Sequence, residues 1–130
     1  MSSIWLKPEL KELYRLNEFI LNELPEENFQ VNLILEEIFV NIMNYSKAEY
    51  IKVDAEFEAP ILTIEFIDNG IEFNPLLKEN PETPTTIDDA EIGGLGILLT
   101  KEMADELEYK YVNGENHLKI IKKVEWWNLN

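Results

Sequence analysis

The sequence has no cysteine, only one histidine, His117, and only one arginine, Arg15. Without cysteine there is no disulfide framework and no thiolate metal site, which fits a reducing compartment. A lone histidine cannot supply a metal cluster, so we assign His117 no role. The sequence also lacks an apolar run of about 18 residues, the length that spans a membrane, and the N-terminal pattern of a signal peptide. We therefore expect a cytoplasmic protein without a membrane partner.

Basic residues are scarce along the whole chain. Lysine and arginine total 11 against 26 aspartates and glutamates, for a formal net charge of −15. Because a nucleic-acid binder needs a basic surface to meet phosphates, direct binding of DNA or RNA is disfavoured. The acidic excess would speed the encounter with a basic protein partner, and it equally suits a surface that keeps a small domain soluble.

Length and hydrophobicity predict one folded domain. The chain has 130 residues, of which 45% are hydrophobic, and this is enough to bury a core without disulfides or metals. No internal repeat and no linker-like segment divides the sequence. We therefore treat residues 1–130 as a single domain.

Apolar spacing predicts the elements of the N-terminal half. Helical spacing of apolar residues marks two helices, and strict alternation marks two strands joined by Ala59-Pro60 as an antiparallel hairpin. In chain order, the expected elements are a short strand Ile4–Leu6, helices Pro8–Glu23 and Glu27–Tyr45, and strands Ile51–Phe57 and Leu62–Phe66.

The C-terminal half begins with a long irregular stretch, from Ile71 to Ile92, which three prolines interrupt. Loops of this length in compact domains are commonly functional lids or disordered segments. A third helix is expected from about Gly94, and Asn113-Gly114 predicts a hairpin between two further strands. Together the elements predict an α+β fold, a two-layer sandwich in which two or three helices cover one face of a mostly antiparallel, mixed sheet. The last strands are Leu107–Val112 and His117–Val124, and the core face of the third helix is Leu95, Leu98, Leu99 and Met103.

Glu37 and Asn41 form the first candidate site. They are four residues apart on the second expected helix, so their side chains stack on one face, at the flank of the apolar stripe, whereas Glu36 points towards solvent. Asn41 offers a neutral carbonyl oxygen that suits Mg²⁺, and Glu37 could accept a proton from an attacking hydroxyl. The alternative is a solvated glutamate and a locally bonded asparagine, and the pair taken alone favours that alternative.

Two further motifs carry weaker signals of their own. Asp68 ends a strand before Asn69-Gly70; its carboxylate could accept a hydrogen bond from the exocyclic amine of adenine, with Gly70 allowing close approach, although Asp-Asn-Gly is also good turn chemistry. Glycines at the expected start of the third helix could hold phosphates through backbone N–H groups, or could form a hinge. Lys101, further along that helix, could reach a phosphate or remain a surface residue. These glycines are Gly93, Gly94 and Gly96.

In this order, the motifs resemble those of the GHKL ATPase/kinase superfamily, which includes the ATP-binding domains of gyrase and of histidine kinases. The sequence is most similar to the small stand-alone anti-sigma factor serine/threonine kinases, in the run from Gly94 to Leu99 and again between Asp105 and Leu118. The similarity extends from about Leu6 to Lys123. The matching motifs are Glu37…Asn41, Asp68…Gly70 and Gly93-Gly94-Leu95-Gly96.

The resemblance implies a Bergerat-type ATP-binding fold with ATP and Mg²⁺ as cofactors. It implies that Glu37 is the catalytic base, that Asn41 is the magnesium ligand and that Asp68 reads adenine, with Gly70 beside the base. It further implies that the three glycines of the box hold phosphates and that 71–92 is the ATP lid. Many members have a histidine four residues after the motif asparagine, where this chain has Tyr45.

The leading hypothesis is an ATP-dependent kinase that phosphorylates a serine or threonine of a partner protein. The resemblance implies an antagonist of the STAS-like type and a sigma factor as partners, and a homodimer. The second hypothesis is a non-catalytic switch in which ATP creates a surface for a partner. A slow ATPase is a third class, and a structural protein that binds no nucleotide is another. A histidine kinase is disfavoured, because no dimerisation helix with a phosphoacceptor histidine accompanies the domain.

Overall fold

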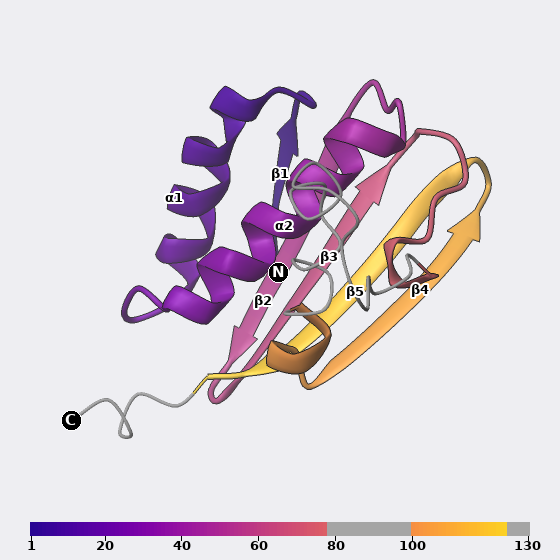
Figure 1. The fold of residues 1–130 in the computed structure, drawn as a ribbon. Helices are drawn as coiled ribbons and strands as arrows, with labels where there is room; N and C mark the ends of the chain where they lie inside the picture. The colour runs from indigo at the N-terminus through magenta and orange to yellow at the C-terminus, as the bar shows by residue number, and fades with distance from the viewer. Residues whose placement is uncertain (78–99, 125–130) are drawn as a thin grey trace, which may run out of the picture.

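The computed structural model describes residues 1–77 and 100–124 of the chain (Figure 1). Within these ranges every expected helix and strand is present, with ends that differ by a few residues, and residues 100–103 are helical. The start of the third expected helix and residues 78–92 of the expected lid lie outside the described residues. The elements are β1 (Ser2–Leu6), the 3₁₀ helix η1 (Leu10–Glu12), α1 (Leu13–Glu23), α2 (Phe29–Tyr45), β2 (Ile51–Glu58), β3 (Ile61–Asp68), the 3₁₀ helix η2 (Pro75–Leu77), β4 (Glu106–Val112) and β5 (Glu115–Lys123).

The five strands form one sheet in the order β1-β2-β3-β5-β4, with α1 and α2 together on one side of it (Figure 1). All four neighbouring pairs are antiparallel, so the sheet, expected to be mostly antiparallel, is antiparallel throughout the described strands. The fold is therefore the expected α+β sandwich. β3 occupies the centre of the sheet, which places its last residue, Asp68, between β2 and β5.

Turn chemistry accounts for the hairpin between β4 and β5. Asn113 and Gly114 have φ angles of 52° and 78°, the left-handed conformation at both central positions that a two-residue type I′ turn requires. Val112 and Glu115 pair directly across this turn. The register of β5 follows from it, and with the register the inward direction of Asn116.

The two helices begin differently from the simplest expectation. Glu9 is extended, so the helical segment starts with η1 rather than at Pro8. α2 begins at Phe29 because Asn28 caps it, with its Oδ1 accepting the Val31 N–H at 3.0 Å; such caps satisfy backbone donors that a helix leaves unpaired.

The single arginine stabilises the approach to α1. Arg15 Nη1 donates to both carboxylate oxygens of Glu12, at 3.0 and 3.1 Å, and the same carboxylate accepts the backbone N–H of Lys7. The Lys7 bond first, and then Arg15, lower the pKa of Glu12 below its ordinary value. Arg15 thus has a structural role at the join between β1 and α1.

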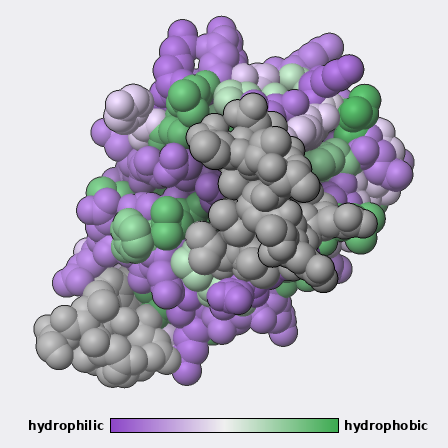
Figure 2. Space-filling model, viewed as in Figure 1, coloured by the Kyte–Doolittle hydropathy of each residue, from purple (hydrophilic) through white to green (hydrophobic). Residues whose placement is uncertain are grey.

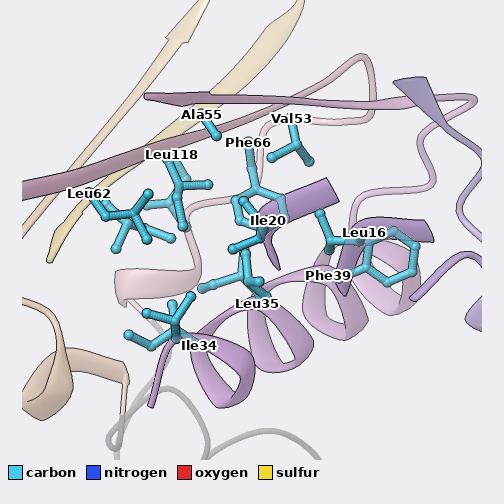
Figure 3. Packing of buried hydrophobic residues seen from close by; sticks show 14 of the residues in the cluster. Leu16, Ile20, Ile34, Leu35, Phe39, Val53, Ala55, Leu62, Phe66 and Leu118 are labelled. Atoms are coloured by element: carbon cyan, nitrogen blue, oxygen red, sulfur yellow. The ribbon is translucent and has the colours of Figure 1, made fainter. Parts of the chain in front are cut away.

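The hydrophobic core lies between the helices and the inner face of the sheet (Figure 3). Phe66 and Val53 point from the strands towards Phe39 and Leu35 of α2, and Leu16 of α1 closes the layer beside them. These side chains are fully buried. Both helices therefore bury their apolar stripe against the same face of the sheet.

The side of the molecule that carries the helices is mostly hydrophilic, with small hydrophobic areas between the polar ones (Figure 2). This distribution agrees with the acidic composition of the chain. Among the described residues, no helix combines the length and the hydropathy needed to cross a bilayer.

Candidate functional site

Asp68 is a buried carboxyl at the end of the central strand. Its side chain is 2% exposed. Oδ1 accepts two hydrogen bonds, from Gly70 N at 2.9 Å and from Asn116 Nδ2 at 3.0 Å. Burial raises the pKa of Asp68 above its ordinary value, and Gly70, Asn116 and the nearby Ser46 hydroxyl oppose this effect. The bond to Gly70 N is the local turn contact expected of Asp-Asn-Gly. Asp68 therefore forms the expected turn and also directs its carboxyl group into the interior.

Gly70 lies against the end of α2. A Cβ at this position would stand 2.2 Å from Ser46 O and 2.7 Å from Ser46 Oγ, so only glycine fits. The next backbone N–H, of Ile71, donates to Ser46 O at 2.7 Å. The structure thus supplies a reason for this glycine that sequence reasoning missed, the close approach of the turn to a helix end.

Ser46 joins the two halves of the site. It is fully buried at the C-cap of α2, its hydroxyl donates to Ile42 O at 2.9 Å, and the same hydroxyl helps to lower the pKa of Asp68. Asn41 lies five residues earlier, a rise of about 7.5 Å along the helix axis. The contact between Ser46 and the turn therefore sets where Asn41 and Glu37 stand relative to Asp68.

Asn41 is the most distinctive residue on α2. It is 1% exposed, and its Nδ2 donates to Glu37 O at 2.7 Å. Within the described part of the chain, its Oδ1 is the single buried side-chain atom without a hydrogen-bond partner. An unsatisfied buried oxygen costs about 1–3 kcal/mol, and a neutral amide oxygen is a donor that Mg²⁺ accepts. Asn41 therefore fits the magnesium ligand expected from the sequence.

Glu37 and Glu36 separate as helical geometry predicts. Glu37 is half-buried on the flank of α2, one turn before Asn41, whereas Glu36 is exposed. Glu37 takes part in an interaction of its own. The side chain expected to act as a base thus lies on the same side of the helix as the expected metal ligand.

Asn116 is the site residue that sequence reasoning missed. It is 3% exposed at the start of β5, and its amide bonds to Asp68, Ile71 O, Phe73 N and the Tyr109 hydroxyl. The available signal was its position next to the Asn113-Gly114 turn, which sets the alternation of β5. That alternation turns Asn116 towards the helices and His117 away from them.

Three residues outside the proposed catalytic set, His117, Tyr45 and Asn69, have defined contacts. His117 bonds to Glu65 Oε1 at 2.9 Å on the outer face of the sheet, and so lies away from the site. Tyr45 contacts the ring of Phe73, with ring centroids 5.5 Å apart. Asn69 Oδ1 accepts the backbone N–H groups of Glu49 and Tyr50, which anchors the segment before β2.

The phosphate-binding half of the predicted site is described only at Lys101. Lys101 is half-buried in the helical residues 100–103, whose end is held by Lys122 Nζ donating to Met103 O at 2.7 Å. The predicted phosphate-binding glycines, Gly93, Gly94 and Gly96, lie outside the described residues, so their role stays a prediction.

Comparison with known proteins identifies the family and agrees with the fold. Residues 11–122 match the family described as histidine kinase-like ATPase domain. The structure is similar to Acinetobacter baumannii histidine kinase AdeS, with a TM-score of 0.56 and 10% identity over 97% of this chain and 69% of that one. It is also similar to the catalytic domain of histidine kinase ThkA, with a TM-score of 0.52 and 13% identity over 95% of this chain and 98% of that one. A search among curated proteins finds no match.

Proposed function

The chain belongs to the histidine kinase-like ATPase domain family, and on that basis we propose that it binds ATP with Mg²⁺ and transfers the γ-phosphoryl group to a serine or threonine of a partner protein. The observation that carries the proposal is the pairing of two buried polar groups on one side of the fold. Asp68 offers an acceptor at the strand end, and Asn41 offers an unpaired oxygen on the helix.

Residues of α2 and β3 have separate roles in the proposed binding and transfer. The Asp68 carboxylate accepts a hydrogen bond from the adenine amine, and this contact selects the base. Asn41 Oδ1 is the residue of this chain that would hold Mg²⁺, which neutralises phosphate charge when bound. Glu37, one turn away, takes the proton of the attacking hydroxyl. Lys101 and the glycines Gly93, Gly94 and Gly96 are proposed to bind phosphates.

The proposed partners follow from the resemblance to anti-sigma factor kinases. They are a STAS-like antagonist that carries the accepting hydroxyl, and a sigma factor, with the chain acting as a homodimer. The net charge of −15 supports a partner with a basic contact surface.

Phosphoryl transfer from labelled ATP to a candidate antagonist domain tests the kinase. Glu37→Gln keeps the size of the side chain and removes the base, so we expect ATP affinity within about twofold of wild type and transfer at least ~100-fold slower. Glu36→Gln, the same change on the exposed neighbour, is the matched control and keeps full transfer. Equal transfer in the two variants would remove the kinase claim.

A non-catalytic switch is the second candidate function. It is favoured by the Asn116 contacts, which connect the base end of the site to the backbone at Ile71 and Phe73. Nucleotide binding at Asp68 would then change a partner surface without any transfer. In that case Glu37→Gln regulates the partner as wild type does, whereas Asp68→Asn does not.

A further inference from the structure

The side-chain amide of Asn116 uses all of its hydrogen-bonding capacity. An amide has two donor hydrogens and two acceptor positions. Nδ2 donates to Asp68 Oδ1 at 3.0 Å and to Ile71 O at 2.8 Å, while Oδ1 accepts from Phe73 N at 2.9 Å and from the Tyr109 hydroxyl. Each of the four positions is therefore occupied.

This network permits a single orientation of the amide. Rotating it by half a turn would set the NH₂ group against the Phe73 N–H, and the amide oxygen against the two acceptors Asp68 Oδ1 and Ile71 O. Three hydrogen bonds would become repulsive contacts, in a place where unsatisfied polar groups cost most, whereas the Tyr109 hydroxyl could adapt because it both donates and accepts. The face that Asn116 presents to Asp68 is thus always a donor.

A fixed donor at this point influences whether the Asp68 carboxyl is ionised or protonated. A carboxylate has about four acceptor positions, and Gly70 N and Asn116 Nδ2 occupy two of them, both on Oδ1. The positions on Oδ2 take neither of these bonds and can accept from a ligand. Because donors favour the ionised carboxylate and burial favours the neutral acid, Asn116 helps to keep Asp68 an acceptor.

We infer that Asn116 is a positioning residue that sets the base selectivity of the site, by holding Asp68 as an acceptor that admits an amino group and rejects a carbonyl oxygen. The inference rests on the proposed nucleotide-binding function. An acceptor pairs with the exocyclic amine of adenine, whereas guanine offers a carbonyl oxygen at the equivalent ring position, and two acceptors repel. The inference names a residue to which neither the motifs nor the family match assigns a role.

The titratable groups that act on or with Asp68 are carboxyls and tyrosines. Burial raises the pKa of Asp68, and Glu115 of β5 adds to this rise electrostatically. The pKa of Tyr50 is raised first by its hydrogen bond to Glu115, and that of Tyr109 first by burial, with the charge of Asp68 adding to both. Glu72 acts on Tyr109 in the same direction. A second carboxyl placed at the site would therefore add to an electrostatic field that already opposes ionisation of Asp68.

Asn116→Asp is the decisive variant because it replaces the donor by a second carboxyl of the same shape. Two adjacent carboxyls cannot both ionise easily, so the pKa of Asp68 rises further. We expect ATP affinity at neutral pH to fall about 10-fold or more, and the ratio of ATP to GTP affinity to fall with it, since a protonated carboxyl can donate to the guanine oxygen. ATP affinity should then recover as pH rises through a range where wild type is constant.

Asn113→Asp is the matched control, because it makes the same charge change on an exposed turn residue of the same hairpin. Titration calorimetry with ATP and with GTP between pH 6 and 9, on wild type and both variants, measures the effect. An Asn116→Asp profile that coincides with the Asn113→Asp profile in both selectivity and pH dependence overturns the inference.

A milder pair of variants covers the case in which Asn116→Asp does not fold. Tyr109→Phe removes one bond to Asn116 Oδ1, and Tyr111→Phe makes the same change two residues along β4. We expect about a two- to fivefold loss of ATP selectivity for Tyr109→Phe and none for Tyr111→Phe. Equal selectivity in these two variants contradicts the inference.

A carboxyl ¹³C titration separates this inference from the proposed function. If wild type binds neither ATP nor GTP, the proposed function fails and base selectivity fails with it. The positioning of Asp68 by Asn116 is then judged alone. It stands if the pKa of Asp68 rises in Asn116→Asp relative to Asn113→Asp, and it is overturned if the two pKa values agree.

Discussion

The two ends of the site treat their buried polar atoms in opposite ways. At the strand end, Asp68 is bonded to Gly70 N and to the amide of Asn116. At the helix end, Asn41 keeps one amide oxygen without a partner among the described residues. The strand end is therefore pre-organised by the protein itself, as a group that must discriminate between bases should be. The helix end carries an amide oxygen without a hydrogen-bond partner, which suits an incoming cation.

The largest expected effect comes from breaking the strand end. Asp68→Asn can keep its amide oxygen in the place of Oδ1, facing Gly70 N and Asn116 Nδ2, but its NH₂ group then replaces the acceptor that would meet the adenine amine. We therefore expect ATP affinity to fall at least about 100-fold, which calorimetry measures. Asp54→Asn, on the outer face of the same sheet, is the control and should leave ATP affinity unchanged.

The raised pKa of Asp68 predicts how ATP affinity depends on pH at the strand end. Base reading needs the ionised carboxylate, so wild-type ATP affinity should fall on the acid side at a higher pH than an ordinary aspartate would cause. Asp68→Asn should lack this acid limb. An acid limb that persists in the variant would assign the titration to another group.

A smaller effect is expected from disturbing the join between the two ends. Gly70→Ala forces a methyl group onto the Ser46 carbonyl, and overpacking of this kind costs about 1–3 kcal/mol. Gly114→Ala meets open space at φ +78°, so it pays only a conformational cost of about 1 kcal/mol.

Urea unfolding and ATP calorimetry distinguish these two glycines. We expect Gly70→Ala to lower both stability and ATP affinity, because it moves the end of α2 relative to Asp68. Gly114→Ala should lower stability alone. Loss of ATP affinity in both variants would mean that the join has no special part in the site.

The smallest effect is expected at the helix end. Asn41→Ala removes the unpaired oxygen. We expect the factor by which Mg²⁺ increases ATP affinity to fall about 10-fold, while the ATP affinity measured without Mg²⁺ stays the same. Asn44→Ala, an exposed change on the same helix, is the control. Comparing ATP titrations with Mg²⁺ and with excess EDTA measures the difference, and an equal Mg²⁺ contribution in both variants would exclude Asn41 as the ligand.

Local patterns were enough to predict most of the elements. Alternation in β2 and β3 and the Asn113-Gly114 turn each act over a few residues, so their structures follow from neighbours in the chain. The separation of Glu37 from Glu36 is likewise a matter of helical period. The start of the first helix was placed too early, at Pro8, because the extended Glu9 and the bonds of Glu12 to Arg15 and Lys7 depend on the packing of β1.

The sequence by itself determined the order of the motifs, the α+β class and the helix face on which Glu37 and Asn41 lie, because each depends on the chain order or on a local period. Only the tertiary structure decided that Ser46 packs against Gly70, and that the amide of Asn116 donates a hydrogen bond to Asp68. Both contacts join residues far apart in the chain. Their partners are set by sheet register and by how α2 packs, which no local pattern encodes.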